Sequence, residues 1–256
     1  MLGRIRRGLA DLRTFTAGLA HELRSPLQNL LGETEVALLA DRSPEEYRET
    51  LRSNLGDLHA LADAVDNLVA WCRTSDPGRR DRNAEAFDLA DEAELRLSRE
   101  RRTARRDGVE LVVERAGNTR IRADREGILR VLRNLAGNAI GHSPPGGRVD
   151  VRILGDADAV RIVVEDRGPG VPADLVDRMF EPFVSGRADK GRRGGYGLGL
   201  AICRTVAGDH GGTCRYEPRE GGGARFIAEI PRDGPAISEP TCPGRTPGGP
   251  SRGRTP

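Results

Sequence analysis

The chain has 256 residues, of which 37% are hydrophobic and 31% charged, and its formal net charge is +2. This length predicts two small domains or one large one, and the nearly balanced charge argues against a nucleic-acid-binding protein. No apolar run approaches the roughly 18 residues that span a bilayer and no signal peptide is recognisable, so we expect a cytoplasmic chain without a membrane segment.

Two amphipathic helices are expected at the N-terminal end. Apolar residues recur at helical spacing over 9–39. In "DRSPEEYRE", Ser43 can cap a second helix, Pro44 suits its first position, and Glu46 completes a capping box. Over 51–72, apolar residues alternate steps of four and three, which is a heptad seam. Because one hairpin cannot bury two such stripes, we expect a homodimer that forms a four-helix bundle.

A polar stretch at 74–86 predicts a linker into a second region that mixes strands and helices. There, Asp124 can cap a helix, and the strands expected at 148–154 and 159–165 alternate at period two. The helix residues expected to face inward are Ile128, Leu129, Leu132, Leu135 and Ile140. The expected elements form an α/β sandwich, in which helices cover one face of a mixed, mostly antiparallel sheet. The tail from residue 233 is rich in Pro, Gly, Ser and Arg and is expected to be disordered. Helices are expected at 87–106, 124–141 and 197–209, and strands at 109–114, 119–123, 148–154, 159–165, 213–217 and 224–230.

The four cysteines, at positions 72, 203, 214 and 242, form neither a CxxC pair nor a zinc spacing. Their distribution predicts buried or idle thiols in a reducing compartment.

"FTAGLAHELRSPLQN" contains a histidine and a proline within a helical pattern. His21 lies two residues from a leucine on either side, so it points away from the apolar stripe. A neutral imidazole can attack an electrophile, and Glu22 beside it can accept the proton from the other ring nitrogen. Pro26 costs about 3 kcal/mol in an ordinary helix, and a kink there would loosen the backbone around the histidine. Alone, a solvent-facing histidine is more often an ordinary surface residue.

Two segments of the second region have side chains suited to a nucleotide. In "NLAGNA", Asn134 and Asn138 share one helix face, and an amide oxygen suits Mg²⁺ beside substrate phosphates. In "EDRGPG", Asp166 ends a strand, where its carboxylate can accept hydrogen bonds from an exocyclic amine such as that of adenine. Gly168 and Gly170 let the backbone pass close to a flat ligand.

Two further segments are rich in glycine or basic residues. "MFEPF" precedes a basic stretch, 184–195, that can fold over phosphates. Gly195, Gly197 and Gly199 open a helix, whose first N–H groups form an anion site. The spacing matches neither the P-loop nor the Rossmann pattern. Each of these segments alone fits a plain turn or surface, but the four in this order indicate a nucleotide site.

"HELRSP", "NLAGNA", "EDRGPG", "MFEPF" and "GGYGLGLA" resemble the H, N, G1, F and G2 boxes of sensor histidine kinases of two-component systems, over about residues 10–231. The resemblance implies an α+β chain: a helical-hairpin dimerisation domain, then an α/β sandwich of the Bergerat (GHKL) type. The expected divisions are an input or connector helix (1–14), a dimerisation and histidine phosphotransfer domain (15–73), a linker (74–86), a catalytic ATP-binding domain (87–232) and a disordered tail (233–256).

The resemblance also implies roles for single residues. His21 would be the phosphoacceptor and Glu22 its partner base. Ser25 takes the place of a polar residue, commonly threonine, with which the family removes phosphate from its response regulator. The chain would use ATP and Mg²⁺, with Asn138 holding the metal, and pass phosphate to the receiver domain of a cognate regulator. The residues implied at the nucleotide are Asn134, Asn138, His142, Asp166, Gly168, Gly170, Phe180, Lys190, Gly195, Gly197, Leu198 and Gly199.

Gly141 departs from the family, because many relatives carry Lys or Arg there. Basic residues within 187–193 can compensate, or nucleotide binding is weaker. A catalytically weak dimeric nucleotide-binding adaptor is therefore one alternative. A gyrase- or chaperone-like ATPase is another, but those proteins have a glutamate base where Asn134 stands. The related kinases carry membrane helices, so the chain would be membrane-associated only as a fragment of a longer sensor.

Overall fold

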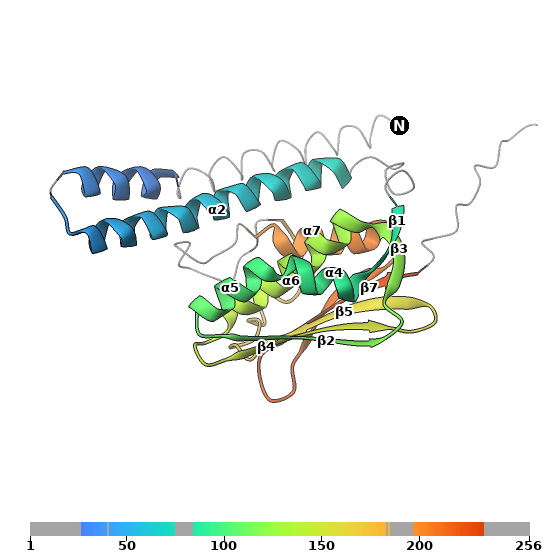
Figure 1. Ribbon diagram of the computed structural model, residues 1–256. Helices are drawn as coiled ribbons and strands as arrows, with labels where there is room; N and C mark the ends of the chain where they lie inside the picture. Colours follow the sequence, from blue (N-terminus) through green and yellow to red (C-terminus); the bar gives the residue numbers. More distant parts are fainter. Residues whose placement is uncertain (1–26, 40, 75–83, 183, 185–196, 233–256) are drawn as a thin grey trace, which may run out of the picture.

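The computed structural model describes residues 27–39, 41–74, 84–182, 184 and 197–232 (Figure 1). The predicted input helix, the proline at position 26, most of the predicted linker and the C-terminal tail lie outside the described residues.

An antiparallel pair of helices forms the N-terminal part of the described chain (Figure 1). Residues 27–38 are helical, and α2 spans Pro44–Thr74. The predicted capping box is confirmed: the Ser43 N–H donates to the Glu46 carboxylate at 2.8 Å, and the Glu46 N–H donates to the Ser43 hydroxyl at 3.3 Å. The Glu46 carboxylate also accepts a hydrogen bond from the Ser43 hydroxyl at 2.9 Å, and its pKa is lowered by the bond from the Ser43 backbone first and by this one second. Local hydrogen bonds therefore fix the start of α2.

The hairpin leaves a row of leucines exposed. Leu30 and Ala37 are buried, whereas Leu51, Leu55 and Leu58 of the predicted heptad seam are each more than half exposed. A single hairpin thus has an apolar stripe with nothing to cover it among the described residues.

The second region is the predicted α/β sandwich. Its five-stranded sheet has the order β2-β4-β5-β7-β6, in which β2 and β4 are parallel and the other pairs antiparallel. Helices α4 to α7 cover one face of this sheet (Figure 1). Strands β1 and β3 pair separately. The bounds are β1 Ala84–Asp88, α4 Leu89–Arg96, α5 Ser98–Arg106, β2 Glu110–Gly117, β3 Arg120–Asp124, α6 Arg125–His142, β4 Arg148–Gly155, β5 Ala159–Glu165, α7 Gly199–Asp209, β6 Thr213–Pro218 and β7 Ala224–Pro231.

The core lies between the helices and the sheet. The α6 residues predicted to face inward are at most 2% exposed, and Asp124 caps the helix by accepting a hydrogen bond from the Gly127 N–H. From the sheet, alternate residues of β4 and β5, such as Val151 and Ile162, are fully buried against them. These predictions are confirmed. No described helix has both the length and the hydropathy to span a bilayer.

The single helix predicted over 87–106 is wrong. Strand β1 takes Phe87 and Asp88 and so crosses the boundary predicted at residue 87. The helix is also divided at Leu97, whose side chain is fully buried. Asp88 starts α4 by accepting hydrogen bonds from the backbone N–H groups of Ala90 and Asp91. The division turns α4 and α5 so that the leucine between them reaches the core.

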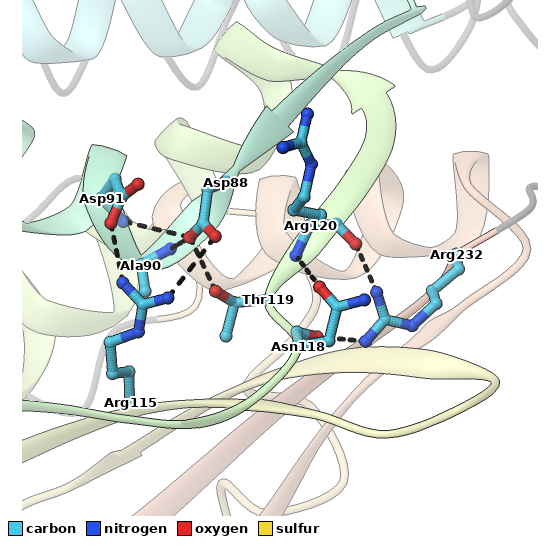
Figure 2. A network of polar contacts seen from close by, with 8 residues as sticks. All are labelled: Asp88, Ala90, Asp91, Arg115, Asn118, Thr119, Arg120 and Arg232. Atoms are coloured by element: carbon cyan, nitrogen blue, oxygen red, sulfur yellow. Dashed lines mark hydrogen bonds and ion pairs between the residues drawn. The ribbon is translucent and has the colours of Figure 1, made fainter.

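A polar network fixes β1 to the sandwich (Figure 2). The hydroxyl of the fully buried Thr119 donates to Asp88 at 2.6 Å, and Arg115 pairs with both Asp88 and Asp91. Nearby, the Arg232 guanidinium donates to the backbone oxygen atoms of Asn118 and Arg120. The first described strand after the linker is therefore held firmly on the second region.

Candidate nucleotide-binding site

Asp166 lies directly after β5 and is only 3% exposed. Its Oδ1 accepts hydrogen bonds from the Gly168 N–H at 2.8 Å and the Ala224 N–H at 3.2 Å. Within the described part of the chain, Oδ2 accepts no hydrogen bond. One carboxylate oxygen is thus occupied by the protein, and the other can receive a donor from a ligand.

Two glycines around Asp166 are required by close backbone approaches. A Cβ at Gly168 would lie 2.4 Å from the backbone oxygen of His142, and one at Gly223 would lie 2.1 Å from the backbone oxygen of Asp166. Gly223 also has φ +100, which disfavours any other residue. Sequence reasoning missed Gly223 and the Ala224 N–H. The run of three glycines before β7 was the available signal.

A hollow of about 710 Å³ opens beside this turn, between the C-terminal end of α6 and the segment after β5. Gly141 and His142 line one side, and Gly168 and Gly170 the other. The volume lies in the range typical of small-molecule sites. With glycine at 141, no long side chain projects into the hollow from that position.

The two predicted asparagines lie on α6, near the beginning of α7. The Asn134 amide donates to the backbone oxygen of Gly199, the first residue of α7, at 3.4 Å. Asn138 is half-buried, one turn further along α6. The structure therefore places Asn134 at the glycine-rich start of α7.

The start of α7 is suited to an anion. Gly197 has φ +66, and Leu198, which is 1% exposed, cannot cap the helix with its side chain. Among the described residues, no side chain caps the first backbone N–H groups of α7, and such groups at a helix start favour anions.

Phe180 packs against the core and is half-buried. The guanidinium carbon of Arg204, on α7, lies 5.8 Å from the centre of its ring. No sequence signal indicated this pair, which links the segment after β5 to α7.

The predicted buried thiols are confirmed for Cys203 and Cys214. Burial raises the pKa of Cys203 well above its usual value, and the neighbouring thiol of Cys214 raises it further. These sulfurs are therefore structural rather than reactive groups.

The predicted residues His21, Glu22, Ser25, Lys190 and Gly195 lie outside the described residues. Their roles stay predictions. In the described ranges, no group of three or more His, Cys, Asp or Glu side chains is arranged to hold a metal ion.

Comparison with known families gives two matches. Residues 11–71 match the His Kinase A (phospho-acceptor) domain. Residues 123–234 match the histidine kinase-, DNA gyrase B- and HSP90-like ATPase family. The second region is therefore an ATP-binding domain of this family.

Relatives and solved structures agree with these matches. The sensor protein IrlS of Burkholderia pseudomallei is 36% identical over 217 residues, which are 84% of this chain and 46% of that protein. The catalytic domain of histidine kinase ThkA has 31% identity and a TM-score of 0.52, covering 58% of this chain and 95% of that one. The structure of histidine kinase ThkA in complex with the response regulator protein TrrA has 27% identity and a TM-score of 0.68, and the match covers 89% of this chain and 64% of that one.

The chain spans about half the length of the curated relatives that it matches. In this chain, the phospho-acceptor match precedes the ATPase match. The chain belongs to the sensor histidine kinases of two-component systems.

Proposed function

We propose that this chain is an ATP-dependent protein-histidine kinase, which phosphorylates itself on His21 and passes the phosphoryl group to an aspartate of a response regulator. The observation that carries this proposal is the geometry of Asp166. A buried carboxylate with Oδ1 held by two backbone N–H groups, beside a hollow of about 710 Å³, suits the exocyclic amine of adenine.

The phosphates of ATP would lie toward the start of α7. Its backbone N–H groups and the positive end of its dipole favour negative charge. Asn134 contacts Gly199 from α6, and Asn138 lies one turn further along that helix. Because Mg²⁺ keeps several waters and takes few protein ligands beside phosphates, the amide oxygen of Asn138 fits as its protein ligand. When bound, the metal would neutralise phosphate charge.

In the proposed reaction, a ring nitrogen of neutral His21 forms a bond to the γ-phosphorus, and the bond from that phosphorus to the β-phosphate oxygen breaks. ADP leaves, and Glu22 accepts the proton of the other ring nitrogen. The work of the protein is mostly positioning and charge neutralisation.

The same chain would act as a dimer on its regulator. Burying an exposed leucine such as Leu55 contributes about 1.5–3 kcal/mol, and the seam formed with Leu51 and Leu58 offers several per subunit. Ser25, four residues after the histidine, would orient water to remove phosphate from the regulator. Because ATP is a cytoplasmic metabolite, we expect these reactions there.

Incubation with γ-labelled ATP tests the kinase assignment. The wild-type chain should acquire acid-labile, alkali-stable label, and the His21→Ala chain should acquire none. Equal labelling of the two would refute the assignment. Nucleotide binding without any label would favour the adaptor, and multiple-turnover hydrolysis independent of His21 would favour the ATPase.

A further inference from the structure

The two neighbours of Asp166 are held by ion pairs on the sheet face that no described helix covers. Glu165 pairs with Arg152 at 2.8 Å and with Arg225 at 3.3 Å. Arg167, on the other side of Asp166 in the sequence, forms an ion pair with Asp150 of β4. The residue proposed to bind adenine is thus flanked by two anchored side chains.

Asp150 receives Arg167 on the outward face of β4. Its sequence neighbours Val149 and Val151 are fully buried in the core, so alternation along the strand turns Asp150 away from the core. Nevertheless, Asp150 is only 9% exposed, because arginine side chains surround it.

The anchoring of Arg167 is double. Its Nη2 lies 3.0 Å from Oδ2 of Asp150, and its Nη1 donates to the backbone oxygen of Arg148 at 2.9 Å. Arg148 in turn donates from Nε to Oδ1 of Asp150 at 2.6 Å. Burial alone would raise the pKa of Asp150, but the hydrogen bonds and charges of Arg148 and Arg167 outweigh it and lower the pKa. Asp150 is therefore charged at neutral pH.

The backbone of Arg167 lies between Asp166 and Gly168. The Gly168 N–H is one of the two donors that hold Oδ1 of Asp166. If Arg167 were released from β4, the Gly168 end of this hydrogen bond could shift, whereas the Asp166 end would still be held by Ala224. The guanidinium of Arg167 reaches Asp150 on the outward face of β4, away from α6 and α7, so the pair would not touch a nucleotide bound beside those helices.

We propose that Asp150 and Arg167 form a positioning pair for nucleotide binding, which fixes the turn after β5 so that the Asp166 carboxylate meets the adenine amine. The inference rests on the proposed function. The pair selects the nucleotide by holding another residue in place, and it takes no part in phosphoryl transfer.

Arg167→Ala in the full chain tests the pair, and Arg161→Ala is its matched control. Both arginines have side chains 37% exposed, and both pair with carboxylates of the sheet, Arg161 with Glu229 at 2.6 Å. Arg161 lies at the other end of the antiparallel β5–β7 pair, away from Asp166.

Kd and KM for ATP should rise about tenfold in Arg167→Ala, because a misplaced carboxylate loses its hydrogen bond to the base. The kcat of autophosphorylation should stay within about twofold of wild type. The preference for ATP over GTP should fall, since GTP lacks the exocyclic amine at that position. Arg161→Ala should match wild type in all three.

Two further variants keep the inference falsifiable if Arg167→Ala folds poorly. Asp150→Asn should shift KM in the same direction, and Arg167→Lys, which can still pair with Asp150, should restore most of the affinity. The inference is overturned if KM rises no more in Arg167→Ala and Asp150→Asn than in the control, or if ATP preference is unchanged. A wild-type chain that binds no ATP would instead overturn the proposed function itself.

Discussion

Replacing Gly168 by alanine should weaken nucleotide binding more than it weakens the fold. The new Cβ would lie 2.4 Å from the backbone oxygen of His142 and 3.1 Å from Oδ1 of Asp166, whereas real Cβ atoms essentially never come within 3.0 Å of another heavy atom. The first neighbour is backbone and cannot rotate away. Either the turn after β5 or the C-terminal end of α6 must therefore move.

The size of the effect follows from the hydrogen bond that this movement breaks. A shift of roughly 1 Å pulls the Gly168 N–H away from Asp166, from its present distance of 2.8 Å. The displaced carboxylate then loses its hydrogen bond to the adenine amine. Because a hydrogen bond to a charged group contributes about 1.5–3 kcal/mol, the Kd for ATP should rise about 10- to 100-fold. The overpacking itself costs about 1–3 kcal/mol of folding free energy, which a domain of typical stability survives.

Calorimetric titration with ATP, together with thermal unfolding, measures both quantities. Gly208→Ala is the control, because Gly208 lies in α7 and its Cβ would have no neighbour within 4 Å. It should stabilise the fold by about 0.5–1 kcal/mol and leave the Kd unchanged. If a folded Gly168→Ala chain binds ATP as tightly as wild type, the geometry around Asp166 is not what holds the nucleotide.

Three further outcomes are expected. Leu55→Asp should dissociate the dimer, as measured by light scattering, because the leucine exposed in one chain would be replaced by a charge buried between the two subunits. An unchanged dimer would place the interface elsewhere. Burial raises the pKa of Asp88, but its hydrogen bonds, that from the Thr119 hydroxyl foremost, lower it overall. The stability that Asp88 contributes is thus present above about pH 4 and lost as pH falls, so the difference in unfolding free energy between wild type and Asp88→Asn should shrink in acid; a pH-independent difference would contradict this. Cys203, with its raised pKa, should resist iodoacetamide at pH 8 until the chain is unfolded, and equal labelling of native and unfolded chains would contradict its burial.

Local pattern was sufficient for most elements. The capping of α2 by Ser43 and of α6 by Asp124 was predicted correctly, because a cap and its partner lie within three residues in the sequence. The inward face of α6 and the alternation in β4 and β5 followed from periodicity for the same reason. The five motif segments were recognisable by their order along the chain, although each alone fits a plain turn or surface.

The division of the helix predicted over 87–106 was not recognisable. That stretch contains no glycine or proline to mark a break. The break at Leu97 comes from the core, where the leucine is fully buried between α4 and α5. Tertiary packing therefore decided this boundary against local helix preference.

The sequence by itself determined that a phospho-acceptor hairpin precedes an ATP-binding sandwich, and it indicated Asp166 as a contact to the base. Only the tertiary structure decided that the Ala224 N–H, 58 residues away, holds that carboxylate, and that the neighbouring Arg167 is anchored on Asp150. The physical reason is that periodicity and capping are set by near neighbours, whereas these contacts depend on the register between strands, which the buried faces of the whole sheet fix together.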